Sequence, residues 1–86
     1  MIIKKDNFIN EFLKDNDNVK SSNLYIIKDS NNNIMYMYNY NTVIASKKIN
    51  DKKIYLNKKK YSMTTTRNTN LIKRIAEKNN YSIIEY

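Results

Sequence analysis

Apolar residues recur along the chain with two periods, one typical of helices and one typical of strands. Near the start, Phe8, Ile9, Phe12 and Leu13 follow each other at helical spacing, and Asp6 precedes them as a suitable N-cap. This pattern predicts a first helix of roughly two to three turns over "NFINEFLK". The next stretch, "DNDNVKSSN", is polar and is predicted to be a linker.

The middle of the chain has the period-of-two pattern of strands. Runs of β-branched and aromatic residues predict four strands, over "LYIIKD", "IMYMYNY", "VIAS" and "KKIYLN". In the second run, Tyr36, Tyr38 and Tyr40 are expected on one face, with Met35 and Met37 on the other. In the fourth run, Ile54 and Leu56 are expected on one face and Tyr55 on the other.

A second helix is predicted from Thr65 or Thr66 to about Lys78. Its apolar stripe consists of residues at helical spacing, Leu71, Ile72, Ile75 and Ala76. Asn79 and Asn80 can end it in left-handed geometry without glycine, and "YSIIEY" predicts a last strand.

The predicted element order is α-β-β-β-β-α-β, which indicates an α+β domain that contains residues 1–86 as a single unit. We expect a mainly antiparallel sheet of about four to five strands with two helices on one face. Such a helix layer covers only one face of the sheet. Either the methionines or the tyrosines of the second strand must therefore face away from it. We expect the tyrosine face to be partly exposed and available to a partner or a second copy.

The composition excludes several kinds of chemistry. The chain has no Cys, His, Gly or Pro. Disulfides, thiolate metal sites, imidazole bases and glycine-dependent phosphate loops are therefore excluded. The start "MIIKKDNF" lacks the long apolar run of a signal peptide or a membrane span, so we expect a soluble, intracellular protein.

No arrangement of residues indicates catalysis. The carboxylates at 15, 17, 29, 51, 77 and 85 fall mostly in predicted loops and turns. A threonine nucleophile at 64–66 would have only lysines 58–60 as a base. We expect no enzymatic activity, no cofactor and no bound metal.

Positive charge is concentrated in the second part of the chain. The net charge is +8, and residues 1–30 contribute none of it, because they hold five lysines and five acidic residues. The candidate binding residues are the cations of the predicted hairpin and second helix: Lys47, Lys48, Lys52, Lys53, Lys58, Lys59, Lys60, Arg67, Arg74 and Lys78. Together they would form one basic surface for phosphates or an acidic partner. The alternative is that the lysines only keep an edge strand soluble.

Tyrosines could complete such a surface. Tyr55 and Tyr61 would lie among the lysines as in platforms that stack single-stranded nucleic acid. A protein interface could be formed by Tyr36, Tyr38, Tyr40 and Tyr55. The threonines of "YSMTTTRNTN" have two readings. They either line a phosphate-binding helix start or cap the helix through Thr64, Thr65 or Thr66, and we expect the cap, which contributes about 1 kcal/mol.

Two segments resemble a pattern in many small bacteriophage proteins, Y-x-T-x-[IV]-A, a hairpin, then Y-S-x-T-T-x-[KR]-x-x-N. The matching positions are Tyr40, Thr42, Ile44, Ala45, Tyr61, Ser62, Thr64, Thr65, Arg67 and Asn70. The chain departs from this pattern at Asn68, where such proteins often carry His. The resemblance implies a phage or prophage accessory protein that acts in the cytoplasm of a bacterial host cell. Small basic proteins of this kind often act by occupying a host machine, as anti-CRISPR inhibitors do.

Three functions are therefore considered. We expect a non-catalytic inhibitor that binds a host defence protein or ribonucleoprotein complex through an acidic or nucleic-acid surface. The first alternative is a regulator that binds DNA or RNA directly with the basic hairpin and second helix. The second is a structural homodimer joined through the tyrosine face. No membrane partner is expected.

Overall fold

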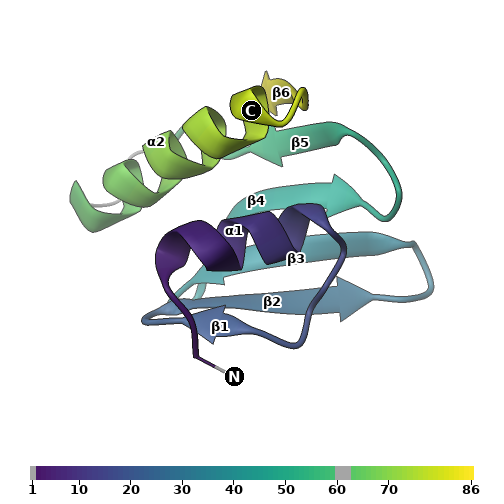
Figure 1. Ribbon diagram of the computed structural model, residues 1–86, viewed down its shortest axis with the longest axis horizontal. Coiled ribbons are helices and arrows are strands. Elements are labelled where there is room, and N and C mark those ends of the chain that lie inside the picture. Colours follow the sequence, from purple (N-terminus) through teal and green to yellow (C-terminus); the bar gives the residue numbers. More distant parts are fainter. Residues whose placement is uncertain (1, 60–62) are drawn as a thin grey trace.

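The computed structural model describes residues 2–59 and 63–86. Within them, six strands form one sheet in the spatial order β1-β2-β3-β4-β5-β6, and two helices pack on one face (Figure 1). The elements are α1 Lys5–Leu13, β1 Lys20–Ser21, β2 Leu24–Asp29, β3 Ile34–Asn39, β4 Thr42–Lys48, β5 Lys53–Leu56, α2 Met63–Lys78 and β6 Ser82–Glu85. The α+β class is confirmed.

The sheet is larger and more mixed than predicted. Strands β1 to β5 pair antiparallel in succession, whereas β6 pairs parallel with β5 after the chain has crossed through α2. The additional strand, β1, lies in the segment predicted to be a polar linker. It has only two residues, and Ile2 forms an isolated bridge to Lys20 beside it. A strand this short shows no period of two in the sequence.

Asparagine, aspartate, serine and one tyrosine replace glycine at the tight turns. Positive φ angles occur at Asp15, Ser22, Asn33, Tyr40, Asn50 and Asn80. Asn80 lies just after α2, as predicted, and Asn and Asp tolerate this conformation best. Tyr40 is the exception, with φ 56° in the β3–β4 turn. The prediction that it continues the strand of Tyr36 and Tyr38 is therefore wrong, because β3 ends at Asn39.

The starts of both helices also differ from the predictions. Helix α1 has Lys4 at its N-cap position, and Asp6 lies inside the first turn, where its negative charge still favours the helix dipole. Helix α2 begins at Met63, before the predicted start at Thr65 or Thr66, so both of these threonines lie inside its first turns. Thr65 is buried there, and its Oγ1 accepts a 2.9 Å hydrogen bond from Asn39 Nδ2.

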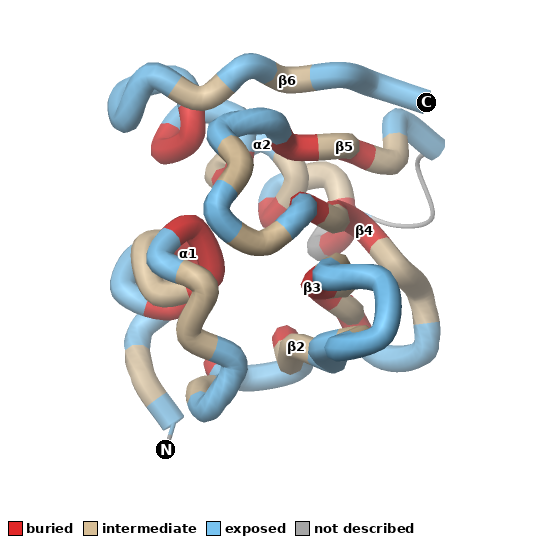
Figure 2. Tube along the Cα trace, turned by 90° about the vertical axis from the view of Figure 1, so that its right-hand side faces the viewer, coloured by how far each residue is buried: buried red, intermediate tan, exposed pale blue. Residues whose placement is uncertain are grey.

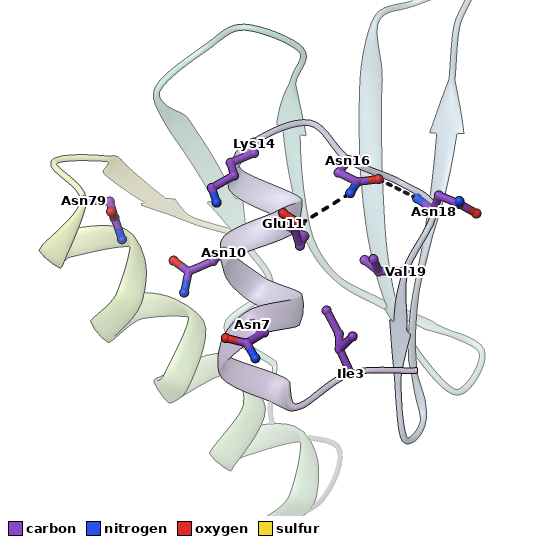
Figure 3. Close-up of a pocket in the computed structure, with 9 residues that line it drawn as sticks. All are labelled: Ile3, Asn7, Asn10, Glu11, Lys14, Asn16, Asn18, Val19 and Asn79. Atoms are coloured by element: carbon purple, nitrogen blue, oxygen red, sulfur yellow. Dashed lines mark hydrogen bonds between the residues drawn. The ribbon is translucent and has the colours of Figure 1, made fainter. Parts of the chain in front are cut away.

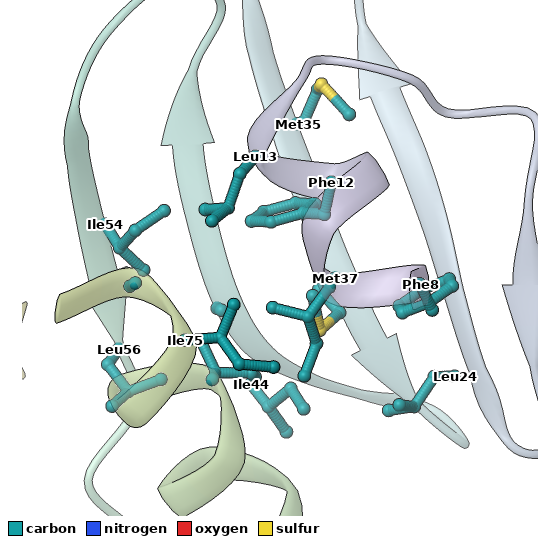
Figure 4. Close-up of a cluster of buried hydrophobic side chains, with 14 residues drawn as sticks. Phe8, Phe12, Leu13, Leu24, Met35, Met37, Ile44, Ile54, Leu56 and Ile75 are labelled. Carbon is teal, nitrogen blue, oxygen red and sulfur yellow. The ribbon is translucent and has the colours of Figure 1, made fainter. Parts of the chain in front are cut away.

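One apolar core fills the space between the helices and the sheet (Figures 2 and 4). Helix α1 contributes Phe8, Ile9, Phe12 and Leu13, all buried as the helical spacing predicted. The sheet and α2 supply the other members: Leu24, Met35, Met37, Ile44, Ala45, Ile54, Leu56, Ile72, Ile75 and Ala76. The register of β3 and β4 shifts between Met37 and Tyr38. Such an irregularity lets consecutive residues of one strand both turn toward the core.

Candidate functional site: the helix-free face of the sheet

The sheet face opposite the helices is formed by side chains that alternate with the core residues. In β3, Met35 and Met37 are buried under the helices, whereas Tyr36 and Tyr38 are half-buried on the other face. The sequence left open which set faces inward, and the structure places the methionines there.

Cross-strand partners share a face of the sheet, so the pairing register identifies the remaining members. Tyr25 pairs with Tyr38, Ile27 with Tyr36, Tyr36 with Ser46, Ser46 with Tyr55, and Tyr55 with Ile84. We call this surface the open face. It consists of Tyr25, Ile27, Ile34, Tyr36, Tyr38, Val43, Ser46, Tyr55 and Ile84, with Lys20, Lys48 and Lys53 at its borders. Ile27 and Ile84 are 48% and 40% exposed, because no helix covers this face.

Two tyrosines of the open face are stacked on each other. The ring centroids of Tyr25 and Tyr38 are 5.1 Å apart, and the rings are inclined by only 9°. Both side chains come from directly opposed positions on β2 and β3, which brings their rings together. Each ring therefore has one face covered by the other ring, which restricts its orientation.

Positive charge borders the tyrosines at two corners. Lys20 pairs with Tyr25 at the β1 edge, whereas Lys48 and Lys53 flank the β4–β5 turn at the other end. Asp29 lies on the same face, at the β2–β3 turn. The pKa of the Asp29 carboxyl lies below its usual value, mainly because the carboxylate accepts a hydrogen bond from the Asn32 side-chain amide. The backbone N–H groups of Asn32 and Asn31 also donate to it and lower the pKa further. This end of β2 is therefore negative.

Lys47 does not belong to the binding surface that the sequence predicted. Its side chain is completely buried on the core face, next to Ile54 of β5. There it forms an ion pair with the Asp15 carboxylate and donates a 3.0 Å hydrogen bond to the Lys48 carbonyl. Asp15 Oδ2 also accepts a hydrogen bond from the Asn50 backbone N–H at 2.9 Å. The pair fixes the end of α1 to the β4–β5 turn.

The other predicted cations do not form a single basic surface. Lys48 and Lys53 lie on the open face, and Lys52 Nζ lies 5.6 Å from the ring centroid of Tyr81. Lys58 and Lys59 line a small hollow of about 120 Å³ between the ends of β5 and β6 and helix α2. The three cations predicted on α2, namely Arg67, Arg74 and Lys78, are exposed in the helix layer. Lys60, Tyr61 and Ser62 lie outside the described residues.

The sequence did not predict that some residues of the open face belong to a binding surface. Tyr25, Ile27 and Ile84 lie in predicted strands, but they acquire a common surface only through pairing with β3 and β5. Lys20 was missed because the strand that presents it was not predicted. The available signal was the alternation in "LYIIKD", which puts Tyr25 and Ile27 on one face.

A larger hollow of about 630 Å³ lies across α1 (Figure 3). Asn7, Asn10 and Asn79 lie on the side toward α2, whereas Ile3 and Val19 lie on the side toward the sheet edge. Its charged members are Glu11 and Lys14, one of each sign. The polar groups are spread over both sides of the helix instead of converging on one point, so this hollow defines no particular ligand chemistry.

In the described part of the chain, no group of three or more acidic side chains is placed to hold a metal ion. Among the same residues, no helix is long and apolar enough to cross a membrane.

Fold and surface together define a small α+β sheet protein with one helix-covered face and one tyrosine-rich open face. The chain belongs to the family described as "Family of unknown function (DUF8033)", whose pattern matches residues 9–85. Comparisons with curated proteins and with solved structures gave no match.

Proposed function

We propose that this protein is a non-catalytic binding protein that holds single-stranded nucleic acid on its open face. The observation that carries this proposal is the set of four tyrosines on one helix-free sheet face, Tyr25, Tyr36, Tyr38 and Tyr55, bordered by lysines at two corners. Aromatic side chains on a sheet stack with unpaired bases, and lysines neutralise the phosphates that link them.

The arrangement of charge fits a strand that crosses the sheet diagonally. Lys20 is on β1 and Lys53 is on β5, four strand spacings away, which corresponds to roughly 19 Å across the strands at about 4.8 Å per spacing. The two lysines also lie at opposite ends of the strands, so the diagonal between them is longer. The tyrosines lie between these corners, whereas the negative Asp29 lies off the diagonal, at the far end of β2. A strand on this path would meet phosphate-binding groups at both ends and aromatic rings in the middle.

Unpaired strands suit this face better than a duplex. In a duplex the base faces are already stacked on each other, so tyrosines on a sheet surface could not stack on them. A free strand exposes its base faces, and each base stacked on an aromatic ring contributes about 1–3 kcal/mol irrespective of its sequence. We therefore propose binding with little sequence preference.

The inhibitor predicted from the sequence is compatible with this mode of binding. A defence ribonucleoprotein exposes part of its guide RNA as a single strand, and a protein that covers such a strand would block pairing with the target. We propose this as the setting in which the open face would act. The support for it is the resemblance to phage proteins, together with a face suited to unpaired bases.

The proposal is tested by fluorescence anisotropy with labelled single-stranded RNA and DNA of about ten nucleotides, and with the matching duplexes. We expect single strands to bind more tightly than duplexes, with an affinity that falls between about 50 and 200 mM salt. Replacing Tyr38→Leu, which removes the ring but keeps an apolar side chain, should weaken binding by about 1–3 kcal/mol. No binding at about 50 mM salt would overturn the proposal. So would a stable dimer, seen by light scattering, that Tyr36→Lys makes monomeric, because the face would then serve a second copy.

A further inference from the structure

A cleft of about 330 Å³ lies at one end of the tyrosine stack. It lies where the β1–β2 and β3–β4 turns meet, and its lining includes Lys20, Ser22, Asn23, Tyr25, Tyr40 and Asn41. The volume is at the lower end of the range typical of small-ligand sites, about 300–1,000 Å³. Aromatic, amide, hydroxyl and ammonium groups thus meet in one small cleft.

Tyr25 connects this cleft to the open face. One side of its ring is covered by Tyr38, so the side chain can meet the cleft only with its other face or its edge. On β1, the next strand outward, the position opposite Tyr25 is Lys20 instead of another aromatic residue. The row of rings formed by Tyr38 and Tyr25 therefore ends at β2, one strand before the edge of the sheet. The next position in this row, on β1, is occupied by Lys20.

Tyr40 is held firmly despite its exposed position. Its hydroxyl oxygen accepts a 2.6 Å hydrogen bond from Asn23 Nδ2, and its backbone N–H donates a 3.0 Å hydrogen bond to the Asn23 carbonyl. The side chain is nevertheless 60% exposed, and its backbone adopts the left-handed conformation that bulky residues seldom occupy. Such strained positions persist where the surrounding structure holds them, and they are frequent at ligand sites.

We propose that this cleft is a nucleotide subsite, which receives one base of the bound strand. The base stacks beside Tyr25 and Tyr40 and extends the row of rings by one layer, while the Lys20 ammonium pairs with the phosphate of that nucleotide. The Asn41 amide and the Ser22 hydroxyl can each donate and accept hydrogen bonds at the base edge. This subsite rests on the proposed function, since it places one end of the strand on the open face.

The subsite can be tested separately from the face by NMR titration of the protein with adenosine monophosphate and, in parallel, with inorganic phosphate. We expect the nucleotide to shift the resonances of Tyr25, Tyr40 and Lys20, and phosphate alone to shift only those near Lys20. Tyr40→Asn keeps a residue that tolerates the left-handed turn but removes the ring, and Lys20→Ala changes an exposed side chain. Each should weaken oligonucleotide binding at least about fivefold.

The outcomes separate this inference from the proposed function. If the oligonucleotide binds and Lys20→Ala weakens it but Tyr40→Asn does not, the subsite is wrong while the path across the face stands. If the mononucleotide shifts the cleft residues but Tyr55→Leu and Lys53→Ala leave oligonucleotide affinity unchanged, the subsite stands and the proposed path across the face fails. Shifts spread evenly over the lysines, without the tyrosines, would show charge attraction only and overturn the subsite.

Discussion

The Lys47 ammonium is buried and paired with the Asp15 carboxylate, although Lys47 lies in the most basic part of the sequence. Its neighbour Lys48 is exposed on the opposite side of the sheet. Two adjacent lysines therefore have unrelated roles, one in joining α1 to the β4–β5 turn and one at the border of the open face.

This difference predicts contrasting effects on stability. Lys47→Ala leaves Asp15 without its cation and opens space in the core, so we expect it to lower the free energy of unfolding by about 3 kcal/mol. Lys48→Ala removes the same charge from an exposed position and should change it by less than about 0.5 kcal/mol. Urea denaturation measures both. Equal losses in the two variants would contradict the buried role of Lys47.

A second prediction concerns the contact between Asn39 and Thr65, which joins the end of β3 to the first turn of α2. Thr65→Val removes the acceptor of a buried hydrogen bond, so we expect a loss of about 1–3 kcal/mol of stability. Among the described residues, Asn39 Oδ1 already lacks a partner, so losing the Nδ2 hydrogen bond would leave both polar atoms of this buried amide unpaired. Asn70→Ala, on the exposed side of the same helix, serves as the control and should be nearly neutral. If both variants unfold at the same urea concentration, the contact contributes nothing.

A third prediction concerns pH and the pairing of α2 with β6. The hydrogen bond from Lys73 Nζ to Glu85 Oε1, 2.9 Å long, together with the charge of Lys73, lowers the pKa of Glu85. Its contribution to stability is therefore present above the pKa of an unfolded glutamate and is lost as pH falls through the lower, folded pKa. Carbon-detected NMR titration should give a Glu85 midpoint below that of ordinary glutamates. In Lys73→Met this midpoint should rise, and an unchanged midpoint would show that the pair does not form in solution.

The sequence predicted those features that depend on local periodicity. Apolar spacing located both helices, and alternation located the strands of the Tyr36 and Tyr55 segments. The end of α2 was also predictable, because Asn80 can adopt the left-handed geometry without glycine. These features are set by neighbours along the chain, so a single sequence suffices.

Features that depend on pairing partners were not predictable in the same way. The methionine and tyrosine faces of β3 are equally regular, and only the position of the helices decides which of them is buried. The parallel pairing of β6 with β5 requires knowing where α2 returns the chain. Likewise, nothing local distinguishes Lys47 from Lys48, since the partner of Lys47 is 32 residues away.

The most direct test of the open face compares two double variants that remove equal charge from opposite sides of the molecule. Lys48→Ala with Lys53→Ala alters the border of the open face, whereas Arg74→Ala with Lys78→Ala alters the helix layer. Single-strand affinity is measured for both across a range of salt concentrations. We predict that the first variant binds more weakly than the wild type. The magnitude of its slope of log affinity against log salt should fall by about 1 to 1.5, as expected for two lost phosphate contacts. The second variant should keep the wild-type slope. Equal loss in both variants, or a larger loss in the helix-layer variant, would contradict binding on the open face.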